Sequence, residues 1–121
     1  MTAAKMIAIL GWIDVDPSGR DSLVAKSAAL QRSTRTDEPG CLNYTISADP
    51  ALPGRIQIVE LWESAHALDA HFQHPNFHAT GAVLRAEPRL GGGSAKYRID
   101  ATDAIRSPDG VPSTTFWSAE S

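Results

Sequence analysis

The sequence predicts an α+β domain, a ferredoxin-like antiparallel four-stranded sheet with helices on one face. Three observations predict it. Apolar, β-branched runs and amphipathic runs follow one another in the order strand, helix, strand, strand, helix, strand. The two middle strands are joined by the short loop 49–54, so they can pair as a hairpin. The 121 residues are enough for one domain with a real core.

The first strand is expected from Met6 to Val15, where nearly every residue is apolar. A strand that is apolar on both sides must be covered on both sides. One layer of helices covers only one face of a sheet. A second copy of the same sheet is the economical cover for the other face, so the sequence predicts a homodimer.

The first helix is expected from Asp21 to Arg35, with Asp16 or Ser18 as the possible N-cap. Proline and glycine in Glu38-Pro39-Gly40 end it. Its inward-facing residues are small or apolar: Leu23, Ala25, Ala28, Ala29 and Leu30.

The second strand, Cys41 to Ala48, alternates, with Leu42, Tyr44, Ile46 and Ala48 on one side. The third, Ile56 to Trp62, leads to a helix that Ser64 caps and Pro75 interrupts. The pattern resumes from Phe77 to Leu84. Gly91 to Gly93 is interpreted as a flexible hinge, and Ala95 to Ile99 as a short last strand.

The third strand carries an unusual acidic residue. Ile56, Ile58, Glu60 and Trp62 share one face, so a carboxylate lies among apolar side chains. Burying an unpaired carboxylate is costly. Glu60 therefore needs a hydrogen-bond or cationic partner, or it holds a proton, and either state suits a ligand pocket.

Composition and charge indicate which kinds of binding partner and which cellular compartment to expect. The net charge of −3 and the scattered Lys and Arg residues argue against nucleic acid. One cysteine, Cys41, excludes an intrachain disulfide and fits a reducing cytoplasm. The apolar run near the N-terminus is about ten residues long, short of the roughly twenty that cross a bilayer. We expect a soluble, cytoplasmic protein without a membrane partner.

Two segments carry motifs in a fixed order. One is Glu38 to Tyr44, EPGCLNY, and the other runs from Glu60 through Trp62-Glu63-Ser64, Ala67 and His71-Phe72 to Pro75-Asn76-Phe77. Together they resemble the antibiotic biosynthesis monooxygenase family. The resemblance covers about residues 5 to 99. It implies a dimeric α+β barrel over residues 1–99, and a cofactor-independent monooxygenase that acts on a small aromatic, phenolic or quinol-type compound.

The resemblance also shows departures. Relatives that oxygenate aromatic polyketides are thought to use an asparagine, a tryptophan and a tyrosine. Trp62 matches the tryptophan, but Ile58 and Leu68 stand at the other two positions. In haem-degrading relatives a tryptophan stands where His71 lies, so haem breakdown is not expected.

The candidate catalytic residues are His71, Glu60 and Trp62, with either His71, expected at a pocket lip, or Glu60 as the base. Trp62 and Phe72 would exclude water, and Asn43 or Tyr44 would hold a ligand carbonyl. The other candidates for ligand contact are apolar: Ile58, Leu68 and Phe77. Alternatives stay open, because Trp62 suits a core and His71 suits a structural bond across a dimer seam.

No cofactor or metal is expected. Four histidines cluster between His66 and His78, but Pro75 breaks the helical spacing that would let His71, His74 and His78 share a metal. Two other functions remain open. One is an isomerase or lyase that moves a proton without oxygen, and the other is a non-catalytic dimer that binds small molecules.

Residues 100–121 have the polar composition of a tail, yet they include Ile105, Val111, Phe116 and Trp117. We expect an arm that packs Phe116 and Trp117 onto its own domain or onto the dimer mate. A frayed terminus is the alternative.

Overall fold

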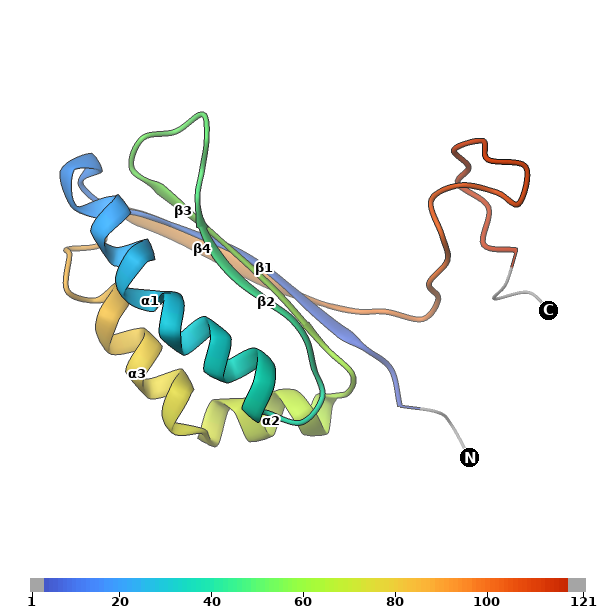
Figure 1. Ribbon diagram of the computed structural model, residues 1–121, viewed down its shortest axis with the longest axis horizontal. Coiled ribbons are helices and arrows are strands. Elements are labelled where there is room, and N and C mark those ends of the chain that lie inside the picture. The colour runs from blue at the N-terminus through green and yellow to red at the C-terminus, as the bar shows by residue number, and fades with distance from the viewer. Residues whose placement is uncertain (1–3, 118–121) are drawn as a thin grey trace.

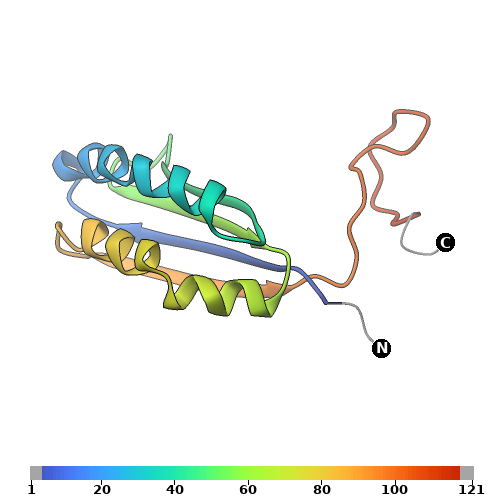
Figure 2. The same ribbon diagram turned by 60° about the horizontal axis from the view of Figure 1, so that its bottom comes forward.

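The computed structural model describes residues 4–117. Its sheet is antiparallel throughout, with the strand order β2-β3-β1-β4. Helices α1 and α2–α3 lie on the same face of this sheet, and the three helices form one layer (Figures 1 and 2). The ferredoxin-like prediction is confirmed. The elements in chain order are β1 Ile7–Asp14, α1 Pro17–Asp37, β2 Cys41–Ala48, β3 Arg55–Trp62, α2 Ala65–Gln73, α3 Pro75–Leu84 and β4 Gly91–Arg98.

The core lies between the sheet and the helices. Alternate residues of β3 point into it, because side chains alternate across a strand, and Ile56 and Trp62 are completely buried. Leu23 of α1 packs against them from the helix layer. Burial of such apolar side chains contributes on the order of 2 kcal/mol each. The sheet and helices are thereby held as one body that positions the side chains between them.

Several boundaries differ from those expected. Helix α1 begins at Pro17, four residues early, because Asp16 accepts a hydrogen bond from the Ser18 amide at 2.9 Å and caps the helix. The hinge predicted at Gly91 to Gly93 is wrong. These glycines begin β4, where Gly91 pairs with Asp14 and Gly93 with Trp12 of β1. Strand pairing with β1 overrides the low strand propensity of glycine.

A β-bulge at the start of β2 changes the expected alternation. The register against β3 shifts between Cys41 and Asn43, so Leu42 has no regular partner. The predicted inward position of Leu42 is wrong, and its side chain is exposed. Beyond the bulge, Tyr44 and Ile46 point into the core as predicted.

The sheet face away from the helices is partly apolar and uncovered in the single chain. Leu10 and Tyr97 are each 51% exposed, and Val59 is also exposed. The register places Leu10 opposite Val59 on one side, while Tyr97 lies on the neighbouring strand β4. The prediction of a homodimer requires an apolar outer sheet face of this kind for a second sheet to cover. The homodimer itself stays a prediction.

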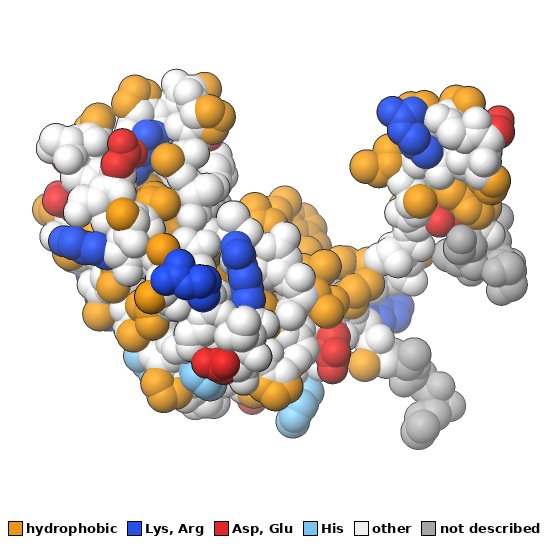
Figure 3. Space-filling view, viewed as in Figure 1, with side chains coloured by type: hydrophobic (Ala, Val, Ile, Leu, Met, Phe, Trp, Pro, Cys, Tyr) orange, Lys and Arg blue, Asp and Glu red, His pale blue; other side chains and the backbone are white. Residues whose placement is uncertain are grey.

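The chain after Ile99 forms an arm. Figures 1 and 3 show that residues 100–117 extend away from the domain and carry exposed hydrophobic atoms. Two backbone hydrogen bonds lie within the arm. The Ser107 amide donates to the Val111 carbonyl at 2.8 Å, and the Ser113 amide donates to the Ile105 carbonyl at 2.9 Å. Phe116 lies within the arm and is exposed, so its contact with a dimer mate stays a prediction. Within residues 4–117, no helix has the length and apolarity to cross a bilayer.

Candidate active site

Glu60 occupies the inner face of the sheet, two residues before Trp62 on β3. The Trp62 indole Nε1 donates a hydrogen bond to Glu60 Oε1 at 3.0 Å. Glu60 is only 9% exposed. Burial raises the pKa of the Glu60 carboxyl, and the Trp62 hydrogen bond opposes this shift only in part. A carboxyl group with a raised pKa is suited to accept and return a proton near neutral pH.

His71 lies behind Glu60, in the last turn of α2. Its Nε2 is 4.0 Å from Glu60 Oε1, and its Nδ1 is 2.7 Å from Glu38 Oε1. A proton on Nδ1 is donated to the Glu38 carboxyl oxygen, and this contact turns Nε2 toward Glu60. Nε2 is buried and has no hydrogen-bond partner among the described residues. The imidazole can therefore share a proton with Glu60 when the gap closes.

Glu38 was not predicted as a site residue, because the sequence indicated only a helix stop and the start of the EPGCLNY segment. It follows α1 as the C-cap residue and is almost fully buried. The Asn76 Nδ2 donates to Glu38 Oε2 at 3.1 Å and to Ser33 Oγ at 3.1 Å. The carboxylate thus has a partner on each oxygen, and the orientation of His71 is fixed. The available sequence signal was the place of Glu38 at the start of the EPGCLNY segment.

The turn after Glu38 requires a glycine. Gly40 has a φ of +83°, in the left-handed region that side chains rarely adopt. A Cβ at this position would lie 2.6 Å from the Ala67 Cβ of α2. Because Gly40 lets the chain turn tightly beneath α2, Glu38 reaches the imidazole of His71 on that helix.

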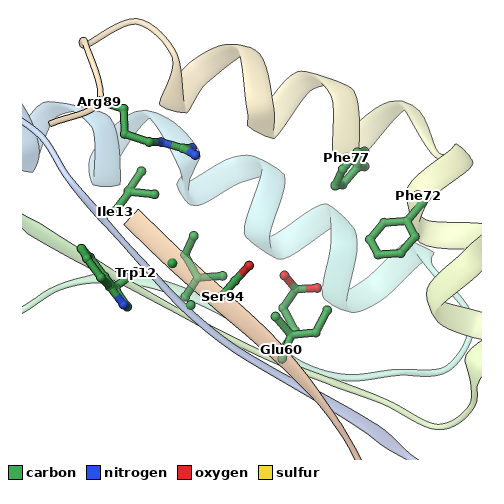
Figure 4. Close-up of a pocket in the computed structure, with 11 residues that line it drawn as sticks. Trp12, Ile13, Glu60, Phe72, Phe77, Arg89 and Ser94 are labelled. Atoms are coloured by element: carbon green, nitrogen blue, oxygen red, sulfur yellow. The ribbon is translucent and has the colours of Figure 1, made fainter. Parts of the chain in front are cut away.

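A cavity of about 300 Å³ opens between the sheet and helices α2 and α3. Figure 4 shows Glu60 pointing into it from β3, with Phe72 and Phe77 on the helix side. His71 and Trp62 do not line it and lie behind Glu60. Its walls combine apolar, glycine and polar residues: Ile9, Gly11, Trp12, Ile13, Ile58, Glu60, Phe72, Phe77, Arg89, Gly93 and Ser94.

Most of the predicted site residues lie together. Ile58, Phe72 and Phe77 line the cavity with Glu60. The Tyr44 ring packs edge-on against His71, with centroids 5.3 Å apart. Burial raises the pKa of Tyr44, and the charge of Glu60 adds to this, so the phenol stays protonated at neutral pH.

Two predicted residues lie elsewhere. Leu68 is buried in the hydrophobic core and does not line the cavity. Asn43 is exposed and accepts a hydrogen bond from its neighbour Thr45 at 2.8 Å. The bulge beside it leaves Asn43 opposite Leu61, on the sheet face away from the helices.

His71 does not sit at a pocket lip, because it is only 1% exposed and ends α2 rather than beginning it. Its ring stacks obliquely on Trp62, with centroids 4.6 Å apart. Glu60 lines the cavity, whereas His71 lies behind it. Arg89 and Ser94 also went unnoticed in the sequence, since each stands alone in a polar, glycine-rich stretch with no motif around it.

A metal site requires several donor side chains close together. Within residues 4–117, no three His, Cys, Asp or Glu side chains form a group that could hold a metal ion. The thiol of Cys41 is free and half-buried, and burial raises its pKa. The polar groups that line the cavity are those of Glu60, Arg89 and Ser94, and the His71 imidazole lies behind Glu60.

Comparison with solved structures supports the fold. A protein from Caulobacter crescentus CB15, provisionally named an antibiotic biosynthesis monooxygenase, is 26% identical, with a TM-score of 0.68 over 83% of this chain and 92% of that chain. A protein from Deinococcus radiodurans with the same provisional name is 24% identical, with a TM-score of 0.69 over 84% and 97%. A conserved protein of unknown function from Bacteroides thetaiotaomicron is 20% identical, with a TM-score of 0.70 over 80% and 100%.

The family comparison is consistent with these structures. No curated protein matches the chain. The model of the antibiotic biosynthesis monooxygenase family matches residues 6–83. The matched segment runs from the start of the sheet to the end of α3 and contains Glu38, Glu60 and His71. Since the match spans more than half of the sequence, the chain belongs to the antibiotic biosynthesis monooxygenase family.

Proposed function

We propose that the protein is a cofactor-independent monooxygenase that acts on a small aromatic, phenolic or quinol-type compound. One observation carries this proposal. A buried carboxyl group with a raised pKa, Glu60, faces a cavity of about 300 Å³, and an imidazole lies 4.0 Å behind it. A 150 Å³ apolar cavity holds benzene. Twice that volume accommodates a ligand of two or three fused rings.

Glu60 serves as the base in this mechanism. The carboxylate removes a proton from a phenolic hydroxyl or from an acidic C–H beside a carbonyl. The proton then lies between Glu60 and Nε2 of His71, whose other nitrogen is held by Glu38. An imidazolium between two carboxylates is stabilised by both of them. Phe72 and Phe77 exclude water from the aromatic anion.

The anion then reacts with dioxygen directly. For an anthrone, a new C–O bond forms at the deprotonated carbon and gives a hydroperoxide after it regains the proton. Loss of water breaks the O–O bond and leaves a ketone, so anthrone and O₂ become anthraquinone and H₂O. One oxygen atom enters the product and the other leaves in water. The substrate supplies both electron pairs, and no external reductant is needed.

We also propose that the working form is a homodimer. The exposed apolar residues Leu10, Val59 and Tyr97 form a continuous part of the outer sheet face. Packing two such faces together would remove this surface from water and build a closed barrel from two chains. The arm, residues 100–117, projects beyond the domain and would reach the mate.

Oxygen uptake tests the enzymatic proposal. The wild type and the Glu60→Gln protein are compared with a panel of hydroquinones and anthrones in an oxygen electrode. The wild type is expected to consume one O₂ per ketone or quinone formed, and Glu60→Gln at least a hundredfold more slowly. Equal uptake by both proteins, or none by either, would refute the proposed role of Glu60 in oxygenation.

An isomerase or lyase acting in the same cavity is the second candidate. Its support is specific, since Ile58 and Leu68 replace the two polar residues that the oxygenating relatives are thought to use, while the base remains. Such an enzyme would turn over its substrate under argon. A non-catalytic binder would instead show saturable binding that Glu60→Gln leaves unchanged, with no product in air or argon.

A further inference from the structure

The two ends of the cavity differ in chemistry. Figure 4 shows Glu60, Phe72 and Phe77 at one end, and Arg89 at the other. At the first end of the cavity, the Glu60 carboxyl group can donate or accept a proton. Arg89 presents a guanidinium that stays charged at any physiological pH. A ligand that fills the cavity therefore meets groups of opposite character at its two ends.

Arg89 comes from the segment between α3 and β4. Figure 4 shows its side chain reaching over Ile13, with the guanidinium turned into the space between helices and sheet. The Arg89 side chain passes beside Gly92 of β4, where a Cβ would lie 3.4 Å from the Arg89 Cδ. The guanidinium can therefore reach a ligand in the cavity.

No carboxylate of the described residues pairs with Arg89. Arg55 shows the contrast, since its guanidinium binds both oxygens of Asp14 at 2.9 and 3.1 Å. Arg20 and Arg35 also have protein partners, since each guanidinium donates a hydrogen bond to a backbone carbonyl. An anion beside Arg89 would displace no protein partner. The planar guanidinium can bind both oxygens of a carboxylate at once.

Ser94 adds a polar group between the two ends. It lies on the helix-facing side of β4, opposite Gly11 of β1, and lines the cavity. A Cβ on Gly11 would approach the Ser94 Cβ to 3.1 Å, so the glycine keeps the space above the serine open. The Ser94 hydroxyl is available as a donor to a ligand oxygen.

We propose that the preferred ligand is an aromatic carboxylate, with its carboxylate held by Arg89 and Ser94 and its ionisable hydroxyl or C–H group directed at Glu60. This inference rests on the proposed function for the reacting end of the ligand. The anion has only one favourable orientation, because Glu60 disfavours a second negative charge at its own end. Arg89 thereby selects the substrate class and orients the ring.

Two matched probes test the proposal under argon. 6-Hydroxy-2-naphthoate and 2-naphthol share their rings and hydroxyl group and differ in the carboxylate. Their affinities for the wild type, Arg89→Gln and Arg89→Lys are measured by fluorescence titration. Arg85→Gln is the control, since Arg85 is an exposed residue of the same region that does not line the cavity.

The wild type is expected to bind the naphthoate at least tenfold more tightly than the naphthol. Arg89→Gln should remove this preference and leave naphthol affinity within about twofold, while Arg89→Lys should keep part of it. Arg85→Gln should match the wild type. Equal affinity of the wild type for both probes, no binding of either, or a preference that survives in Arg89→Gln, overturns the inference.

The outcome separates this inference from the proposed function. If the naphthoate preference depends on Arg89 and no hydroquinone or anthrone drives oxygen uptake, the anion site stands and the oxygenase proposal fails. If oxygen uptake depends on Glu60 but affinity for the two probes does not depend on Arg89, the oxygenase proposal stands and the anion site fails.

Discussion

His71 Nδ1 lies 2.7 Å from Glu38 Oε1, and both side chains are shielded from solvent by the helices and sheet. The two residues are 33 positions apart in the sequence, and the Gly40 turn brings them together. This contact orients the His71 ring so that Nε2 faces Glu60. The rest of the proposed chemistry depends on that orientation.

Replacing Glu38 should destabilise the fold. Glu38→Ala leaves the Nδ1–H of His71 and the amide of Asn76 buried without an acceptor, which should cost about 2–4 kcal/mol in the free energy of unfolding. Glu38→Gln keeps an oxygen facing His71 and should cost less than half as much. Urea unfolding measures both. A Glu38→Ala protein as stable as the wild type would contradict the assigned contact.

Two replacements of His71 separate its two nitrogens. Asparagine places an amide near the Nδ1 position and can keep the bond to Glu38, whereas glutamine reaches toward the Nε2 position and Glu60. If proton sharing through Nε2 matters, His71→Asn should lower the rate constant for oxygen uptake by about 10²-fold or more. Its KM should change little, because His71 does not touch the cavity. A KM effect without a rate effect would mean that His71 only supports the wall.

The stability of the protein should depend on pH through Glu60. Burial raises the pKa of the Glu60 carboxyl above its ordinary value of 4.5, so the folded state holds the proton more tightly than the unfolded state. This contribution to stability is fully present below about pH 4.5 and is lost as the pH rises through the folded-state pKa.

Glu60→Gln removes this dependence and keeps an oxygen to accept from the Trp62 indole. The wild type should therefore lose stability relative to Glu60→Gln between about pH 4.5 and pH 8, as measured by urea unfolding at a series of pH values. A constant difference across this range would show that Glu60 titrates normally.

Most of the fold could be predicted from the sequence, because its main signals are patterns of neighbouring residues. The apolar run of β1, the alternation of β2 and the break at Pro75 are each visible in the residues themselves. The glycines of β4 were wrongly predicted as a hinge, since a strand at that position is specified by its partner β1 and not by its own propensities.

The site was predicted only in part. Alternation along the third strand was enough to place Glu60 on its apolar inner face, where it lines the cavity. Which groups lie behind it depends on how α2 packs on the turn after α1, and a sequence pattern does not encode that packing. Glu38 was therefore missed, and His71 was placed at a lip. The β-bulge that leaves Leu42 exposed also has no sequence signature here.

Filling the cavity should block ligand binding without unfolding the protein. Ile58 lines the cavity and is only partly buried, so Ile58→Phe can extend its ring into the open space. We expect at least a tenfold loss in affinity for 2-naphthol and a change of less than about 1.5 kcal/mol in stability. Isothermal titration and urea unfolding give the two numbers. Unchanged affinity would place the ligand elsewhere.

A charge on the outer sheet face should separate the proposed dimer. Leu10→Lys puts a cation into the surface that would face the second copy, and sedimentation should then show a monomer with native circular dichroism. Leu52→Lys is the matched control, because Leu52 is equally apolar and exposed but lies in the loop between β2 and β3. A monomeric wild type, or dissociation by Leu52→Lys as well, would contradict this interface.

Deuterium exchange at the methylene carbon of anthrone, measured by NMR in D₂O under argon, tests most directly whether Glu60 removes a proton from a bound ring. The wild type should accelerate exchange at least a hundredfold over buffer, and Glu60→Gln should remain within a few-fold of the buffer rate. Anthrone that binds to the wild type but exchanges no faster than in buffer, or equally fast exchange in Glu60→Gln, would contradict the account.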